Sequence, residues 1–196
     1  MKIGYLGPEG SFSEEAALSF GRAEELAAYQ SFGLIKALEE GKIQKAVVPI
    51  ENSIEGAVTW VLDLLVKNNL PFFIEAEIIW NIKQNLIGFG SISEIKIVYS
   101  HPQALGQCRD FLNKLGIETK DTNSTSEAVL IAERGDPALA AIGTRRAAEI
   151  YDVPIIKEDI SDNHNNQTRF IVLGREQKKR TGKDKTSFIF GAENKP

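Results

Sequence analysis

Residues 161–174 read SDNHNNQTRFIVLG and join two kinds of sequence without a spacer. The first half, through Thr168, carries almost only side-chain hydrogen-bonding groups. The second half, residues 169–173, is an aromatic and aliphatic run typical of a buried strand. Thr168 and Arg169 therefore lie where a polar loop enters a rigid element, a position suited to holding a reacting group. Taken alone, the polar half is more typical of a solvated Asn-rich turn.

Strand-like and helix-like segments alternate along the chain on both sides of one long β-type segment. Short apolar runs are followed by polar turns and by amphipathic stretches that often begin at a capping Ser or Thr. Residues 72–89 alternate apolar and polar side chains over a length that suits a strand passing between two lobes. This pattern predicts an α/β protein with mainly parallel sheets. The expected strands are 2–6, 45–50, 72–89, 95–99, 117–120, 138–142 and 169–173, and the expected helices begin near residues 13, 32, 56, 103, 127 and 145.

Polar turns follow most of the expected strands, where parallel sheets bind ligands. They are rich in small hydroxyl and amide groups, which suit an anionic ligand held by backbone N–H groups. Helix capping alone accounts for many of these Ser and Thr residues. The pairs Glu51-Asn52 and Thr168-Arg169 are not explained as caps. The turns are 7–13, 51–53, 100–103, 123–126 and 162–168.

Composition excludes several classes of protein. The net charge of −4 and the pI near 5.4 argue against a nucleic-acid-binding surface. A single cysteine, Cys108, excludes a disulfide framework and a cysteine metal cluster. The N-terminus has no long apolar core typical of a signal peptide, and no apolar run is long enough to span a membrane. The sequence therefore predicts a cytoplasmic protein that interacts with neither nucleic acid nor membrane.

Four motifs resemble those of the prephenate dehydratase family and occur in that family's order. They are GPEGSFS at 7–13, VPIENS at 48–53, SHPQAL at 100–105 and NQTRF at 166–170. The resemblance covers roughly residues 1–175. Members of this family convert prephenate to phenylpyruvate, water and carbon dioxide in phenylalanine biosynthesis, without a cofactor or a metal. The resemblance also implies a homo-oligomer, either a dimer or a tetramer.

The resemblance implies a two-lobed α/β fold like that of the type II periplasmic binding proteins, with the site in the cleft between the lobes. Lobe one would comprise residues 1–75 plus about 171–175, and lobe two residues 76–170. Residues 176–196 would be a linker and the start of a regulatory ACT domain. Residues 185–190 resemble only the first strand of that phenylalanine-binding domain, and its usual Glu-Ser-Arg-Pro signature is absent. This pattern favours either a shortened chain or a form without the sensor.

The resemblance also assigns the site residues. Thr168 would be the catalytic hydroxyl, which positions or relays a proton because a threonine is a poor acid. Prephenate is a dianion, so helix N-termini and local donors would bind it, since the net charge of the chain repels it. Glu51 would orient donors, and Phe170 would pack or influence regulation. The substrate-binding residues expected are Glu51, Asn52, Ser53, Ser100, Gln107, Arg169 and Phe170.

Two other functions fit the same sequence. An arogenate dehydratase would act on a substrate with an amino group in place of the keto group, and no sequence feature separates it from a prephenate dehydratase. A two-lobed ligand-binding or sensor module would use the cleft without chemistry. The combination of residues 51–53 with 168–170 weighs against that module, because a simple binder needs no such reactive set.

Overall fold

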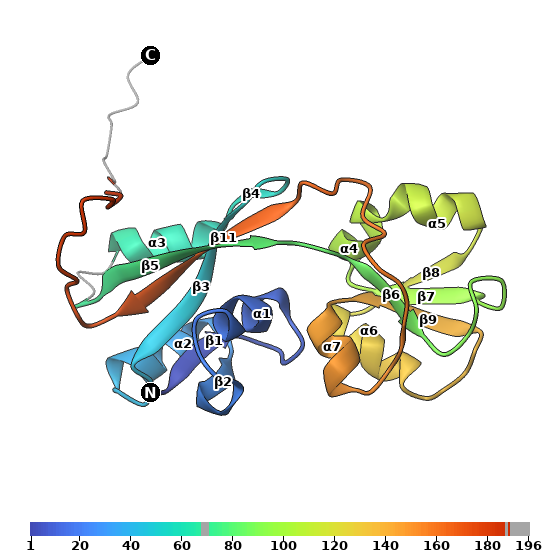
Figure 1. The fold of residues 1–196 in the computed structure, drawn as a ribbon, viewed down its shortest axis with the longest axis horizontal. Helices are drawn as coiled ribbons and strands as arrows, with labels where there is room; N and C mark the ends of the chain where they lie inside the picture. Colours follow the sequence, from blue (N-terminus) through green and yellow to red (C-terminus); the bar gives the residue numbers. More distant parts are fainter. Residues whose placement is uncertain (68–70, 187, 189–196) are drawn as a thin grey trace, which may run out of the picture.

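The strands gather in two sheets, one in each of two lobes (Figure 1). The computed structural model describes residues 1–67, 71–186 and 188. The first sheet has the order β2-β1-β3-β11-β5 with β4 paired to β3, and the second has the order β10-β6-β9-β7-β8. The predicted two-lobed α/β fold is therefore confirmed. The strands are β1 (Ile3–Leu6), β2 (Leu26–Tyr29), β3 (Lys45–Asn52), β4 (Gly56–Ala57), β5 (Phe73–Asn81), β6 (Asn85–Gly88), β7 (Ile97–Ser100), β8 (Glu118–Asp121), β9 (Leu139–Gly143), β10 (Ile155–Lys157) and β11 (Gln167–Gly174).

Both sheets are mixed, which corrects the expectation of mainly parallel sheets. β1 pairs in parallel with β2 and β3, and β7 pairs in parallel with β8 and β9. In contrast, β11 runs antiparallel to both β3 and β5, and β6 runs antiparallel to β9 and β10. Alternation of strands and helices predicts the parallel pairs, because a helical crossover returns the chain in the same direction. It does not predict the direction of strands that cross from one lobe to the other.

The two lobes are joined by two chain crossings that lie side by side. The predicted long β-type segment is two strands, since β5 ends in the first sheet and β6 begins in the second. Between them, Ile82 N donates to Asn166 O at 2.8 Å, which ties the outgoing crossing to the returning one. The expected lobe boundaries at 75 and 171 fall inside β5 and β11, and both strands belong to the first sheet. We therefore propose boundaries near 81 and 167.

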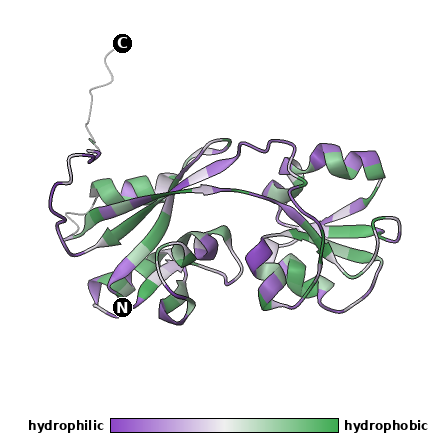
Figure 2. Ribbon diagram, in the orientation of Figure 1, coloured by the Kyte–Doolittle hydropathy of each residue, from purple (hydrophilic) through white to green (hydrophobic). Residues whose placement is uncertain are grey.

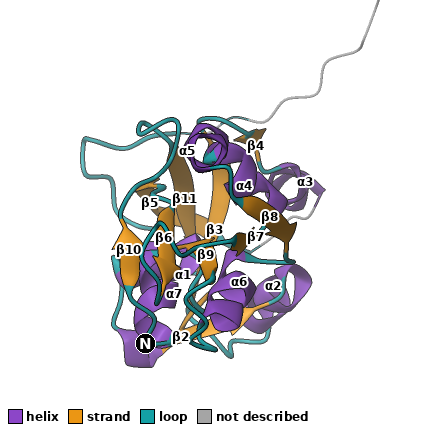
Figure 3. Cartoon of the chain, turned by 90° about the vertical axis from the view of Figure 1, so that its right-hand side faces the viewer, coloured by secondary structure: helices purple, strands orange, loops and turns teal. Residues whose placement is uncertain are grey.

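Helices cover both faces of each sheet (Figures 1 and 3). The expected helix beginning near residue 103 is divided at Cys108, and the one expected from residue 56 begins at Thr59. No helix of the described ranges is long and apolar enough to cross a membrane. Half of the expected ACT strand at 185–190 lies outside the described residues, namely positions 187, 189 and 190. The helices are α1 (Phe12–Leu18), the 3-10 helix Ala23–Glu25, α2 (Ser31–Glu39), α3 (Thr59–Lys67), α4 (Pro102–Gln107), α5 (Arg109–Leu115), α6 (Thr125–Ala132) and α7 (Arg145–Ile150).

Strand β11 contributes to the cores on both faces of the first sheet. Hydrophobic residues concentrate in the strands of both lobes, as Figure 2 shows. Phe170 and Val172 pack with α1, whereas Ile171 and Leu173 pack with α2 and α3. Consecutive residues of a strand point to opposite faces. Thr168 therefore shares the α1 face with Phe170, and Arg169 shares the opposite face with Ile171.

A buried ion pair joins the two strands that flank β11. Lys45 in β3 forms an ion pair with Glu75 in β5, whose side chain is 1% exposed. Between them lies Gly174, where a Cβ would be only 1.8 Å from Glu75 Oε1. Burial raises the pKa of Glu75, but hydrogen bonds from Lys45 Nζ and Glu176 N lower it more, so its net pKa is lowered. The pair therefore stabilises the folded state when Glu75 is ionised.

Lys45→Met is expected to lower the free energy of unfolding by about 3 kcal/mol, because it leaves Glu75 charged and buried. A lowered carboxyl pKa contributes stability above the ordinary value of 4.5, and that stability is lost as pH falls through the folded-state pKa. The difference between variant and parent should therefore shrink in acid. Urea unfolding of the variant and the parent at pH 7 and pH 3 measures this difference in the free energy of unfolding.

The control, Lys178→Met, removes a half-exposed lysine 3.4 Å from Glu75 and should lower the free energy of unfolding by less than about 1 kcal/mol. Equal losses for the two variants would contradict the prediction.

Candidate active site

Thr168 lies at the start of β11 and is held by Asn52 of the neighbouring strand. The two residues are register partners, and the Thr168 residue is only 8% exposed. Asn52 Nδ2 donates to Thr168 Oγ1 at 2.9 Å and to Asn166 Oδ1 at 2.8 Å. Asn52 Oδ1 accepts from the backbone N–H groups of Ile54 and Glu55 at 2.9 and 3.0 Å. Both ends of the Asn52 amide are thus fixed, and so is the oxygen that it contacts.

The proton of the Thr168 hydroxyl has no acceptor among the described residues. Its oxygen accepts a hydrogen bond from Asn52, and no acceptor for its own proton occurs within residues 1–67, 71–186 and 188. A hydroxyl can donate one hydrogen bond while it accepts another. Thr168 is therefore a fixed donor with a free proton.

Ser53 fastens the end of β3 to the loop that enters β11. Ser53 N donates to Gln167 O at 2.9 Å, and Ser53 Oγ accepts from Gln167 N at 3.0 Å. A weaker contact of 3.5 Å joins Ser53 Oγ to Asn166 Oδ1. Ser53 therefore stabilises the geometry around Thr168 and Asn52 rather than adding a free donor.

A cavity of about 370 Å³ lies between the lobes next to this cluster. Its volume is within the range of small-molecule sites. Gln107 of α4 lines it from lobe two, and Gln107 Oε1 accepts from Gln84 Nε2 at 3.0 Å, while the Gln107 amide nitrogen has no acceptor within the described ranges. None of the lining residues is Lys or Arg. The lining residues are Ile54, Glu55, Gln103, Gly106, Gln107, Ser161, Asp162, Asn163 and Asn166.

The structure does not bring Ser100 or Phe170 to this cavity. Ser100 is fully buried at the end of β7, and its hydroxyl donates to Ile142 O at 2.7 Å. Phe170 is 2% exposed and packs in the core with Ile3 and Tyr5. Within the described residues, both side chains contact other parts of the protein and neither lines the cavity.

Arg169 and Glu51 lie on the opposite face of the strand from Thr168. Arg169 Nε is 3.5 Å from Glu51 Oε2, and Arg169 Nη1 is 3.4 Å from Glu77 Oε1. The Arg169–Glu51 contact is an ion pair without hydrogen-bond geometry, since Nε has no hydrogen-bond partner within the described residues. The guanidinium is already balanced by two carboxylates and does not face the cavity.

Three residues of the cavity region were not among the site residues expected from the sequence, although two of them lie in the predicted polar turn 162–168. Asn166 links Asn52 to the cavity, and its place in the NQTRF motif was the signal for it. Gln84 is 3% exposed and holds Gln107, and no sequence pattern identified it. Both carboxylate oxygens of Asp162 accept from Asp110 N, at 3.2 Å, at the start of α5. The positive end of that helix therefore offsets the charge of Asp162.

The conventional proton donors have other contacts. His101 Nδ1 accepts from Gln103 N at 3.2 Å and caps α4, and His164 Nδ1 is 3.1 Å from Asp159 Oδ2. Burial and the nearby carboxylates of Asp162 and Asp159 raise the pKa of the Cys108 thiol, which keeps it protonated. No cluster of three or more His, Cys, Asp or Glu residues suited to a metal ion occurs in the described part of the chain.

Comparisons with known proteins assign the family. The prephenate dehydratase family model matches residues 3–178. The chain is 41% identical over 182 residues to a prephenate dehydratase of Lactococcus lactis, covering 91% of this chain and 65% of the relative. It is 38% identical over 204 residues to arogenate dehydratase/prephenate dehydratase 1 of Arabidopsis thaliana, covering all of this chain and 51% of the relative.

A solved structure shares the fold. The crystal structure of the prephenate dehydratase from Staphylococcus aureus superposes with a TM-score of 0.78 at 32% identity, covering 91% of this chain and 67% of that one. The chain spans less than two thirds of the length of the two curated relatives above. The family model covers nearly all of the described residues, and the chain therefore belongs to the prephenate dehydratase family.

Proposed function

We propose that this chain catalyses the decarboxylating dehydration of prephenate to phenylpyruvate. The observation that carries the proposal is the Thr168 hydroxyl, which Asn52 fixes at 2.9 Å and whose proton has no acceptor in the described residues, while the same Asn52 amide contacts Asn166 of the cavity lining. A small cavity with convergent polar groups is a typical active site. The family and the relatives named above support the same reaction.

The chemistry requires little from the protein beyond orientation and one proton. The bond from the ring carbon to the hydroxyl oxygen breaks, and that oxygen leaves as water after gaining a proton. The bond from the ring to its carboxylate breaks, and its electron pair completes the aromatic ring while carbon dioxide is released. Thr168 donates a hydrogen bond to the leaving oxygen, where negative charge develops in the transition state, and relays to it a proton that comes from water. Aromatisation supplies the driving force.

Neutral donors would hold the dianion in this proposal. No lysine or arginine of the described residues lines the cavity, so amide N–H groups are the donors that it offers there. Gln107 offers its free amide nitrogen from lobe two, opposite Asn166 of the returning crossing. Neutral dipoles fixed in place cost no reorganisation during the reaction. Arg169, Glu51, Ser100 and Phe170 would act indirectly, by holding the strands that carry Thr168 and α4.

One observation favours a second substrate. Glu55 lines the cavity from the turn that Asn52 caps, and it is exposed there. A carboxylate at this position would attract the amino group that arogenate carries in place of the keto group of prephenate. Arogenate dehydration by the same Thr168 chemistry is therefore the second candidate. A binding module without chemistry has no comparable support.

Incubation of the purified chain with prephenate and with arogenate tests the proposal. Formation of phenylpyruvate, followed by its absorbance, is expected with prephenate and is expected to be lost in Thr168→Val. Formation of phenylalanine from arogenate at the higher kcat/KM would favour the second candidate. Turnover of neither substrate by a folded chain would contradict both. We also propose a homo-oligomer, either a dimer or a tetramer, in the cytoplasm, and light scattering measures its mass.

A further inference from the structure

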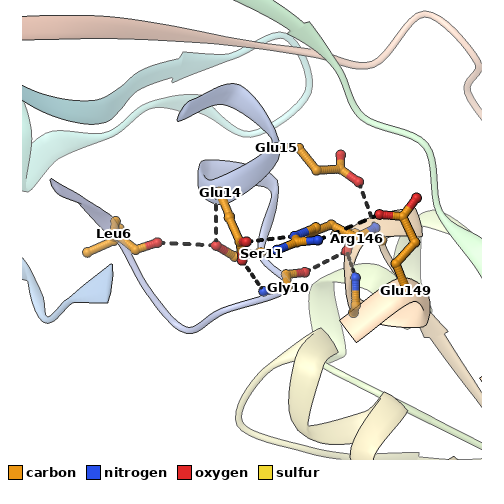
Figure 4. A network of polar contacts seen from close by, with 9 residues as sticks. Leu6, Gly10, Ser11, Glu14, Glu15, Arg146 and Glu149 are labelled. Carbon is orange, nitrogen blue, oxygen red and sulfur yellow. Dashed lines mark hydrogen bonds and ion pairs between the residues drawn. The ribbon is translucent and has the colours of Figure 1, made fainter. Parts of the chain in front are cut away.

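The two lobes make a second contact away from the crossings, between α1 and α7. Helix α1 and the loop before it belong to lobe one, and α7 belongs to lobe two. Figure 4 shows that their polar side chains point toward one another. We refer to the five residues of this contact as the interlobe clamp: Gly10, Glu14, Glu15, Thr144 and Arg146.

Glu14 is the centre of the interlobe clamp. Its side chain is 5% exposed, and its Oε1 accepts from Arg146 Nε at 2.7 Å. Its Oε2 accepts from Gly10 N at 2.6 Å. A buried carboxylate is tolerated only when it is paired and hydrogen-bonded. The only arginine or lysine paired with Glu14 in the described residues is Arg146 of the other lobe, so separating the lobes would leave a buried charge uncompensated.

Gly10 allows the lobes to approach closely. Thr144 Oγ1 of lobe two donates to Gly10 O at 2.5 Å. A Cβ on Gly10 would lie 2.8 Å from Ala147 Cβ and 3.0 Å from Ser126 Oγ, both in lobe two. Gly10 also has φ of +77°, which favours glycine. The clamp therefore depends on the absence of a side chain at this position.

The clamp is connected to Thr168 through packed elements. Glu15 Oε1 accepts from Arg146 N at 3.2 Å, and Glu15 Oε2 accepts from Trp80 Nε1 at 3.0 Å. Trp80 is the register partner of Thr168 in β5. The two alanines that directly follow Glu15 in α1 belong to the same buried cluster as Phe170, which is two residues along β11 from Thr168. Movement of α7 relative to α1 would therefore move lobe two relative to Thr168.

We propose that the interlobe clamp holds the two lobes at their working separation before substrate binds, so that Glu14 and Arg146 are positioning residues. Only the expected changes in KM and kcat rest on the proposed function; the expected change in the separation of the lobes does not. The groups of both lobes are then already in position when substrate binds in the cleft between them. When the clamp is broken, part of the population opens, and the apparent affinity falls by the fraction that remains closed. Closed molecules with bound substrate react as before.

Arg146→Met is the first test, because it removes the charge and keeps much of the aliphatic side chain. We expect KM to rise about tenfold or more with kcat close to the parent value, and the radius of gyration in solution scattering to increase. Arg146→Lys should recover part of both changes. The control is Arg145→Met, which removes the neighbouring charge from α7 and breaks an ion pair with Glu158 at 2.7 Å outside the clamp. If Arg146 had a purely structural role, Arg146→Met would lower the melting temperature without raising KM at a constant kcat.

Gly10→Ala is the second test, since the added methyl group would push against Ala147 of lobe two. Its control is Gly41→Ala, which has φ of +71° and no atom within 4 Å of the added Cβ. Both variants place a Cβ at a similar positive φ, and only Gly10→Ala should expand the molecule. An unchanged radius of gyration in both Arg146→Met and Gly10→Ala would overturn the clamp. A rise of KM in Arg145→Met equal to that in Arg146→Met would also overturn the clamp. Scattering tests the clamp even if prephenate is not the substrate, so the two proposals fail separately.

Discussion

Thr168→Val is expected to lower kcat by about 10²- to 10⁴-fold while KM changes little. The hydroxyl proton that would stabilise the leaving oxygen is lost, and that interaction strengthens only in the transition state. The fold should survive, because valine has the shape of threonine and suits a strand. Asn52 Nδ2 also keeps a partner, since it still donates to Asn166 Oδ1 at 2.8 Å. Steady-state kinetics with prephenate, together with thermal unfolding, measures the effect.

Two variants control for the loss of a threonine. Thr168→Ser keeps the donor and should retain reduced but measurable activity. Thr119→Val makes the same change on the exposed strand β8, away from the cavity, and should match the parent. If folded Thr168→Val turned over prephenate at the parental rate, the proton would come from another group, and the role of Thr168 would be wrong.

Asn52→Asp is expected to lower kcat/KM by about 10²- to 10³-fold, the effect of removing one fixed donor. The change replaces Nδ2, which donates to Thr168 Oγ1, with an acceptor. The Thr168 hydroxyl would then donate to the new carboxylate instead of the substrate, and the added charge would repel the dianion. The oxygen that accepts from Ile54 N and Glu55 N is retained, so the turn should keep its shape.

The pH dependence separates this mechanism from general damage. A carboxylic acid regains a donor when it is protonated, and its ordinary pKa is about 3.9. The loss of kcat/KM should therefore be smaller at pH 5 than at pH 8, relative to the parent at each pH. The control Asn163→Asp adds the same charge to the same cavity and leaves Asn52 in place. If that control lost as much activity as Asn52→Asp, repulsion alone would explain the effect.

Motifs and local patterns predicted much of the molecule. The apolar runs and capping residues located most of the helices, because caps and amphipathic faces are encoded within a few residues. The strand β2 was not predicted, since Leu26–Tyr29 is short and contains two alanines, which are uncommon in strands. The break of the helical segment at Cys108 was also not predicted, although Gly106, a residue that weakens helices, lies two positions before it.

Site prediction was less complete for a geometric reason. Thr168 and Arg169 were both placed at the substrate, but neighbours in a strand point to opposite faces. The alternation of side chains could have been applied to the predicted strand, and it places the side chains of Thr168 and Arg169 on opposite faces of the sheet. Ser100 was expected in the site from the family resemblance, and in the structure its hydroxyl is buried and donates to Ile142 O. Its contact depends on the neighbouring strand β9, which a local pattern does not specify.

The sequence by itself determined the family, the alternation of elements and the identity of the catalytic candidate, since these are contained in short motifs and local periodicity. Only the tertiary structure decided which side chains meet. Asn52 and Thr168 are 116 residues apart, and Glu14 and Arg146 are 132 residues apart. Both contacts depend on where the chain returns: β11 to the first sheet, and α7 to the face of α1. Such long-range contacts form only when the whole core packs, so no local pattern encodes them.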